Sequence, residues 1–297
     1  MKTIVLVVLY GRENTKTSTT QSLLNLDTNY KDYTLLLFNN GPSRINTEGD
    51  IHFLDLQKRF DSVFLYNDIS NRSLSDIYNS MFESFTADRY IIFDDDSLFS
   101  EDYFNTSLHK DIDIHLPLIS SNTDQQIYYP RKDGRIVKNM EDYIERNGKC
   151  KIYSIGSGMI IYSSLISKFK KMSLHLFDPH FALYGVDFSL FRKIEKNISS
   201  CYSVKFHING NIHHSMTGLD KKIPKWRHEE RMYDYILSIK YYSKNKCVGR
   251  LKFILFILRK MWTKDFFNLI KYIKLFINGW HYRSDGTLDL FNVKNEK

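Results

Sequence analysis

Three consecutive carboxylates, Asp94, Asp95 and Asp96, give this chain of 297 residues its clearest chemical signature. They follow an apolar, β-rich run, Tyr90–Phe93, which is typical of a strand buried on both faces in a mostly parallel sheet. Ligands bind at the carboxyl edge of such sheets, and adjacent acids repel one another unless a cation or donors lie close. Asp94 and Asp96 could face the same way and hold a divalent ion. A solvated acidic turn before a helix near Ser100 is the alternative interpretation.

Two further constellations lie in the second half of the chain. Asp187 follows an aromatic loop and a glycine and leads into an apolar helix start at residues 188–192. It is therefore either a helix N-cap or a partly desolvated general base. His213 and His214 form an imidazole pair, which we expect in a loop, and neutral histidine is a common metal ligand. Two ordinary loop histidines are the alternative.

Polar residues also end the first two predicted strands. Tyr10, Asn39 and Asn40 would lie at the ligand edge of the sheet, where an aromatic ring and amides can hold a nucleotide base. Arg72, next to Asn71, stands at the start of the helix that leads into the carboxylate strand, where it could contact a diphosphate. The alternatives are asparagines that form turns and a solvated arginine.

The elements that must position these residues alternate in the first half of the chain. Strands are predicted at residues 3–10, 33–38, 63–66 and 90–93, with helices at 15–26 and 73–85. This β-α-β-β-α-β order is typical of a nucleotide-binding half-domain. Residues 152–162 predict a strand pair or a bent strand interrupted by Gly156 and Gly158, and residues 120–138 predict a polar loop.

The amino-acid composition limits the class of protein to which this chain can belong. The chain is 42% apolar and 15% aromatic, so it can fill the core of a large α/β domain. Three widely spaced cysteines predict neither disulfides nor a metal site, and we expect a reducing, cytoplasmic location. The start of the sequence predicts a buried strand better than a signal peptide, and no apolar window is long enough to span a membrane.

The basic charge is concentrated near the C-terminus. Residues 221–283 contain 16 Lys and Arg against 4 Asp and Glu, a balance of +12, whereas the whole chain carries +8. Basic residues alternate with apolar ones from Lys246 to Arg283, which predicts amphipathic helices with Trp262 and Trp280 near the borders of the apolar face. We expect this region to contact an anionic membrane surface, making the protein peripheral on the inner face of the cell membrane. Simple packing on the rest of the protein is the alternative.

Taken together, these motifs resemble glycosyltransferase family 2, the inverting GT-A enzymes, and within it bacterial rhamnosyltransferase-like members of surface-polysaccharide pathways. The resemblance covers Thr3 to about Gly218. The segments that carry it are Val8–Glu13, Phe38–Pro42, Asn71–Asn79, Phe93–Ser97, Ser157–Gly158, Tyr184–Phe188 and His213–His214. It implies a GT-A (Rossmann-like) α/β fold, with a mostly parallel sheet flanked by helices, in residues 1–220. Residues 221–297 would form the basic helical extension.

The resemblance also implies roles. Asp187 would be the catalytic base, and Asp96 and His214 would hold a divalent metal, Mn²⁺ or Mg²⁺. The implied donor-binding residues are Tyr10, Glu13, Asn39, Asn40, Asn71, Arg72, Asp94 and Asp95. The donor would be a UDP- or dTDP-sugar, and the hexosyl or rhamnosyl group would pass to a lipid-linked saccharide acceptor in O-antigen or capsule biosynthesis.

The chain departs from the family pattern at two positions. Val186 precedes Asp187 where the family commonly has Glu, and Asn39 stands where it usually has Asp. The first departure leaves open a catalytically impaired protein that binds carbohydrate or nucleotide sugar. A nucleic-acid-binding protein is the other competing class, but the aromatic residues of the basic region lie in apolar stretches rather than between exposed cations, so we expect no nucleic acid partner.

Overall fold

The computed structural model describes residues 1–28, 30–105, 111–147, 151–215, 223–262 and 268–291. Its first half alternates strictly between strands and helices. The elements are β1 (Thr3–Leu9), α1 (Ser18–Asn25), β2 (Tyr30–Asn39), α2 (Ile51–Arg59), β3 (Phe60–Asn67), α3 (Leu74–Ser84) and β4 (Arg89–Asp94). All four predicted strands and both predicted helices are present. The predicted order was wrong in omitting α2, which is capped by Asp50 and buries only Phe53 and Leu56.

The second half contains many short elements and one long strand, β13. They are β5 (Leu98–Phe99), α4 (Glu101–Asn105), β6 (Ile114–Ser121), β7 (Ile127–Tyr129), β8 (Arg131–Lys132), β9 (Arg135–Ile136), β10 (Glu141–Glu145), β11 (Ile152–Tyr153), β12 (Met159–Tyr162), α5 (Ser163–Lys171), α6 (Val186–Lys193), the π-helix η1 (Ile194–Ile198), α7 (Ser199–Cys201) and β13 (Val204–His214). The predicted loop at 120–138 instead includes β7, β8 and β9. The predicted strand pair at 152–162 is split, because β11 pairs with β8 and β12 with β4 and β6.

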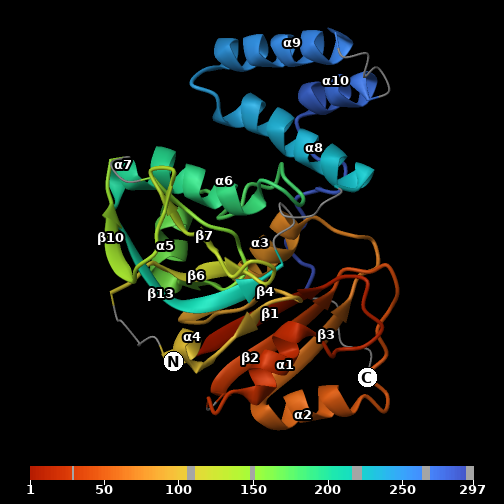
Figure 1. Cartoon of the computed structure of the whole chain (residues 1–297), viewed down its shortest axis with the longest axis vertical. Helices are drawn as coiled ribbons and strands as arrows, with labels where there is room; N and C mark the ends of the chain where they lie inside the picture. The colour runs from red at the N-terminus through yellow and green to blue at the C-terminus, as the bar shows by residue number, and fades with distance from the viewer. Residues whose placement is uncertain (29, 106–110, 148–150, 216–222, 263–267, 292–297) are drawn as a thin grey trace.

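The main sheet has the order β10-β13-β6-β12-β4-β1-β2-β3 (Figure 1). Strands β1 to β4 run parallel, as do β6 and β13, whereas β12 and β10 are antiparallel to their neighbours. The predicted fold class, a mostly parallel sheet flanked by helices, is confirmed. The carboxyl ends of β1, β2 and β4 meet at one edge, since Val8 pairs with Asp94 and Leu9 with Asn39.

Both faces of the sheet are covered, as the unbroken apolar strands require. Every residue of β1 is buried. Ile4, Leu6 and Val8 belong to one hydrophobic cluster, and the alternate residues of the strand belong to a second on the opposite face. The side-chain period of two therefore places the sheet between two apolar layers.

Three helices follow the sheet: α8 (Lys225–Tyr242), α9 (Lys246–Trp262) and α10 (Leu269–Asn278). They lie beyond α6, at the end of the molecule away from α1 and α2 (Figure 1). The segment 279–291 then returns to the sheet, where Phe291 packs edge-on against Phe38 and Tyr66. One hydrophobic cluster includes residues from β1, α8, α9 and α10, so the core is continuous across the predicted boundary at residue 220. The division into two domains stays a prediction.

Candidate active site

The three consecutive aspartates at the end of β4 have separate partners. Asp95 accepts two hydrogen bonds from the Arg12 guanidinium, at 2.8 and 2.7 Å, and a third from the Tyr10 backbone N–H at 3.2 Å. Asp94 and Asp96 instead lie beside His214. Asp95 thus holds the loop after β1 in place. Asp94 and Asp96 do not take part in these bonds, and they can bind a ligand together with His214. Arg12 was not predicted from the sequence, because an arginine in an exposed loop carries no signal of its partner.

His214 reaches this edge because β13 is a long strand beside β6. The prediction that the imidazole pair lies in a loop was wrong: both histidines end β13, and His213 pairs with Leu98 of β5, two residues after Asp96. His214 Nδ1 lies 3.0 Å from an Asp96 carboxylate oxygen, and Nε2 lies 3.7 Å from Asp94 Oδ2. His213 Nδ1 contacts the Ser120 hydroxyl at 2.8 Å. The two histidines therefore face different surroundings.

Asp94, Asp96 and His214 could together hold a metal ion. Each offers one ligand atom, and these three atoms all lie within 4.8 Å of one another. Two carboxylate oxygens and one imidazole nitrogen are a donor set that suits Mn²⁺ and, with oxygens from a bound ligand, Mg²⁺. Among the residues that the structure describes, this is the one such group of acidic, histidine and cysteine side chains.

Two serines connect the aspartate run to the neighbouring strand. Ser97 Oγ lies 2.5 Å from Ser157 Oγ and 3.2 Å from His214 Nδ1. The Asp94 backbone N–H donates to Ser157 Oγ at 3.2 Å. Both serines are fully buried, so these bonds hold the turn and the imidazole in place. The Ser157–Gly158 motif was the sequence signal for this contact.

The pKa values of Asp94, Asp96 and His214 are shifted because several acidic groups lie close together. Burial, together with the charges of Asp96 and Asp95, raises the pKa of Asp94 to about 6, although His214 opposes the shift. Burial acts against ionised Asp96 as well, but the hydrogen bond and the charge of His214, together with a hydrogen bond from Ser215, outweigh burial and lower the pKa of that carboxyl. The same carboxylates raise the pKa of His214 against the effect of burial. The site therefore favours a positive charge between Asp94 and Asp96.

Asp187 lies in the first turn of α6 and does not cap that helix. The N-cap is Gly185, whose φ of 82° falls in the left-handed region that glycine adopts readily. Burial raises the pKa of Asp187 to about 7, the charge of Asp94 adds to the shift, and the Gly156 N–H opposes it by donating a hydrogen bond to the carboxylate. The N-cap interpretation was therefore wrong, and a carboxyl with this pKa is suited to proton transfer near neutrality.

Gly156 is needed for this approach. A Cβ on residue 156 would lie 2.6 Å from Asp187 Oδ1, closer than any real contact of that kind. Gly156, which interrupts the apolar run predicted at 152–162, thus leaves space for the carboxylate. Tyr78, fully buried on α3, is a further neighbour that the sequence did not identify: burial and the charges of Asp94 and Asp187 raise the pKa of its phenol.

The asparagines predicted for donor binding are engaged within the protein. Asn39 is fully buried, and its amide donates to the Ser43 carbonyl and to Asn67 Oδ1, each at 2.7 Å. Asn40 accepts from the Arg72 N–H at 2.7 Å and donates to the Arg72 carbonyl at 3.0 Å. These bonds order the loops after β2 and β3. Any contact with a donor stays a prediction.

The other predicted donor residues differ in accessibility. Arg72 forms ion pairs with Asp68 and Asp285, both at 2.7 Å, and Asn71 accepts from Arg283 at 2.8 Å. The segment 279–291 thus covers this loop. Tyr10 is 53% exposed and Glu13 is exposed as well, so both are accessible from solvent in the loop after β1.

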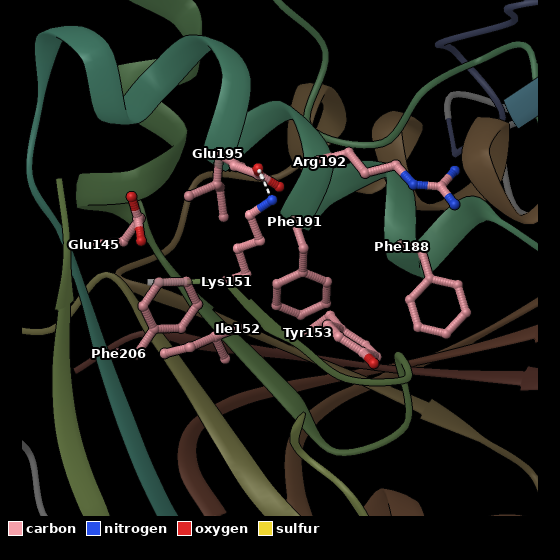
Figure 2. Close-up of a pocket in the computed structure, with 10 residues that line it drawn as sticks. Glu145, Lys151, Ile152, Tyr153, Phe188, Phe191, Arg192, Glu195 and Phe206 are labelled. Carbon is pink, nitrogen blue, oxygen red and sulfur yellow. Dashed lines mark ion pairs between the residues drawn. The ribbon is translucent and has the colours of Figure 1, made fainter. Parts of the chain in front are cut away.

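A pocket of about 340 Å³ is lined in part by Phe188, the residue that follows Asp187 in the chain. Figure 2 shows Phe188 and Tyr153 on one side of it, Phe206 on the other, and the Lys151–Glu195 ion pair of 3.1 Å between them. The Tyr153 and Phe188 rings meet edge to face with centroids 5.6 Å apart, and Tyr129 lies 6.4 Å from Phe188. Aromatic rings beside a proton acceptor form a surface on which a flat, partly apolar molecule can stack.

The pKa of Asp187 generates a prediction about stability. An unfolded aspartate has a pKa near 3.8, so between that pH and about 7 the folded chain keeps a proton that the unfolded chain has lost. Folded-state stability therefore falls as pH rises through this window. We expect Asp187→Asn to raise the free energy of unfolding at pH 8 by roughly 1–3 kcal/mol, and to have little effect near pH 4.

Thermal melts of both proteins across this pH range provide the measurement. Asn keeps an oxygen that can accept from the Gly156 N–H, so the variant removes the charge and little else. Equal shifts in Tm at pH 4 and pH 8 would contradict a raised pKa.

No protein-family model and no curated protein sequence matches the chain. Solved structures do match it in fold. TarS of S. aureus aligns with a TM-score of 0.52 at 12% identity over 84% of this chain, which spans 41% of the TarS chain. TarS 1–349 in complex with UDP-GlcNAc aligns over the same share at 11% identity and a TM-score of 0.52, covering 69% of that chain.

A third neighbour is GalNAc-T7 with UDP, GalNAc and Mn²⁺, which has a TM-score of 0.52 and 14% identity, over 80% of this chain and 47% of that one. At these identities the likeness concerns the fold. The chain therefore has the GT-A-like α/β fold of these glycosyltransferases, as its motifs predicted.

Proposed function

We propose that this protein is an inverting glycosyltransferase of the family 2 type. It moves a hexosyl or rhamnosyl group from a UDP- or dTDP-sugar to a lipid-linked saccharide in O-antigen or capsule biosynthesis, at the inner face of the cell membrane. The observation that carries the proposal is the convergence of Asp94, Asp96 and His214 with Asp187 at the carboxyl edge of a GT-A-like sheet. These groups come from three separate parts of the chain, and their meeting has no evident structural purpose.

A divalent cation fits the first three residues. Asp94 and Asp96 favour a positive charge between them, and His214 contributes a nitrogen at 3.0 Å from Asp96. A bound Mn²⁺ or Mg²⁺ would neutralise the charge that develops on a leaving diphosphate. Asp95 is occupied by Arg12 and would act by holding the loop after β1, where Tyr10 and Glu13 are accessible to the donor.

Asp187 supplies the base for a single in-line displacement. Its carboxylate takes the proton of an acceptor hydroxyl while that oxygen bonds to the anomeric carbon, and the bond from this carbon to the diphosphate oxygen breaks with its electron pair. The nucleoside diphosphate leaves, and Asp187 returns the proton to water. A pKa of about 7 leaves much of the group ionised at neutral pH and makes it basic enough to accept a proton.

The neighbouring proteins support a uridine donor as the first to test. TarS is described with UDP and with UDP-GlcNAc, and GalNAc-T7 with UDP, GalNAc and Mn²⁺. The choice of sugar depends on side chains that 11–14% identity does not preserve. UDP-sugars and dTDP-rhamnose therefore belong in the same screen.

The aromatic pocket lies on the acceptor side of the base. Phe188 directly follows Asp187 in the chain, and the pocket extends from Phe188 toward Phe206 (Figure 2). Phe188 and Tyr153 would stack against the apolar face of an acceptor sugar, leaving a hydroxyl beside Asp187. This surface would position the nucleophile without touching the donor.

The catalytic role of Asp187 is tested by transfer. We expect Asp187→Asn to lose roughly 10²–10⁴-fold in kcat, the contribution of a positioned base, while donor affinity stays within a few fold. Release of nucleoside diphosphate from a panel of sugar donors measures turnover, and calorimetry measures donor binding. Tight donor binding by the wild type without any turnover would indicate a binding protein of the same fold.

The metal site has a matched pair of variants. We expect His214→Ala to weaken Mn²⁺ binding at least tenfold in the presence of UDP, because it removes the nitrogen ligand. His213→Ala should leave Mn²⁺ affinity unchanged, since that ring bonds to Ser120. Electron paramagnetic resonance of free Mn²⁺ gives both constants. Identical affinity in the two variants would remove His214 from the site.

The acceptor surface has its own control on the adjacent strand. We expect Phe188→Ala to raise the KM for the acceptor several-fold and to leave the KM for the donor unchanged. Tyr128 of β7 precedes Tyr129 and bonds instead to Asp124 at 2.7 Å, so Tyr128→Ala should change neither constant. If Phe188→Ala altered only donor kinetics, the acceptor would have to bind elsewhere.

A further inference from the structure

Helix α9 has apolar residues on two opposite faces. Phe253 and Phe256 point inward, where Phe253 stacks on Phe276 with centroids 3.9 Å apart and Phe256 meets Tyr272 at 5.6 Å. The opposite face carries a second set of apolar side chains, which are between 46% and 89% exposed. We call this set the outer stripe; its members are Leu251, Ile254, Leu255, Leu258, Met261 and Trp262. Their spacing of three and four residues places them on one side of the helix.

Helix α10 repeats the arrangement. Tyr272 and Leu275 are buried, whereas Ile270 and Ile277, on the opposite side, are 70% and 69% exposed. Packing against α8 therefore uses only one face of each helix. The prediction of a single apolar face is corrected here: each helix has an inner face, which packs, and an outer apolar face, which no described residue covers. Trp280, predicted at a border, lies after α10 and packs against His180.

Cations flank the outer stripe. Within α9 and α10 there are seven Lys and Arg residues and no Asp or Glu. At 100° per residue, Lys252 and Arg259 fall on one side of the stripe and Arg250 on the other, and all three are exposed. Lys271 of α10 is paired with Glu229 of α8 at 2.8 Å, so it contributes less. An exposed apolar stripe between rows of positive charge is typical of a helix that lies in a membrane interface.

Charge complementarity decides between the possible occupants. A second copy of this chain would bring one row of cations against another, which disfavours a dimer through this face. An anionic bilayer satisfies both features at once, because acyl chains accept the apolar side chains and phosphate headgroups accept the cations. In the described part of the chain, no helix combines the length and the apolar character needed to span a bilayer.

We propose that the outer faces of α9 and α10 form a docking surface for an anionic lipid bilayer. The outer stripe enters the boundary between headgroups and acyl chains, and Arg250, Lys252 and Arg259 lie at the level of the phosphates. This inference deepens the membrane location of the proposed function, but it rests on the exposure and charge of the two helices and not on transferase activity. A protein with no transferase activity would bind vesicles equally well.

The experiment is co-flotation with vesicles of phosphatidylcholine alone or with 30% phosphatidylglycerol, at low and at high salt. The stripe variant carries Leu251→Gln, Leu255→Gln and Leu258→Gln. The matched control carries Ile51→Gln, Leu54→Gln and Ile144→Gln, three residues that are also exposed but lie on α2 and β10. All six side chains lie at the surface, so both proteins should fold, as circular dichroism and Tm will verify.

We expect the wild type and the control to bind anionic vesicles, with binding reduced by salt, and the stripe variant to bind at least tenfold more weakly. A charge variant, Arg250→Gln with Lys252→Gln and Arg259→Gln, should lose the preference for anionic lipid. Equal binding by the stripe and control variants, or no binding by the wild type to anionic vesicles at low salt, would overturn the proposal.

Fluorescence supplies a second readout. Trp262 is 89% exposed, and in a Trp226→Phe, Trp280→Phe background it is the single tryptophan. We expect its emission to shift to shorter wavelength with anionic vesicles and to be quenched by brominated acyl chains. Light scattering after size exclusion tests the competing occupant. A dimer that depends on the outer stripe, together with an unshifted Trp262 spectrum in vesicles, would assign this face to a second copy instead.

Discussion

Four carboxylates that repel one another lie at the carboxyl edge of the sheet, and this repulsion determines which groups must surround them. Asp94, Asp95 and Asp96 are adjacent in the chain, and the charge of Asp94 acts on Asp187. Such a cluster persists only where positive charge or hydrogen-bond donors offset it. Arg12 offsets Asp95, His214 offsets Asp96, and the cost that remains falls on Asp94 and Asp187, whose pKa values are raised. Asp94 and Asp187 are thus the carboxyls of this cluster whose charge the protein compensates least.

The scaffold that brings these groups together was partly predictable. Strands β1 to β4 each contain an apolar run of four or more residues, and the helices α1 and α3 have N-caps, Thr17 and Ser73, so the local pattern was enough. Helix α2 was missed because only Phe53 and Leu56 are buried in it, too few to reveal a helical period. Most of the short strands in the second half of the chain were not predicted, for a different reason. β5, β8, β9 and β11 are two residues long, and such elements are defined by their partners rather than by their own sequence.

The candidate site shows the same contrast. The carboxylates could be predicted because three acids after a buried strand have few structural uses. The placement of His214 depended on β13 pairing with β5 and β6, which are remote in sequence, so the histidine pair was assigned to a loop. Gly156 was recognised as an interruption of an apolar run, but the atom that lies against it, Asp187 Oδ1, comes from a segment 31 positions further along the chain. The residue types were enough to predict the acidic and histidine side chains of the candidate site. Their positions relative to one another depend on strand pairing between distant segments, which the sequence pattern did not reveal.

Polar side chains that have hydrogen-bond partners within the protein differ in meaning from buried carboxyls whose ionisation is unfavourable. Asn39, Asn40 and Arg72 each have protein partners at 2.7–3.0 Å, and those bonds account for their presence as loop-ordering residues. Asp94 and Asp187 have no comparable explanation, since burial and like charge make both of them unfavourable to ionise. A folded protein tolerates such groups where a ligand or a reaction makes use of them. The same reasoning applies to the outer stripe of α9, where exposed Leu, Ile and Trp side chains contribute nothing to the packing of the helix. The carboxyls and the outer stripe do not stabilise the isolated chain, so both indicate a surface at which the protein binds another molecule.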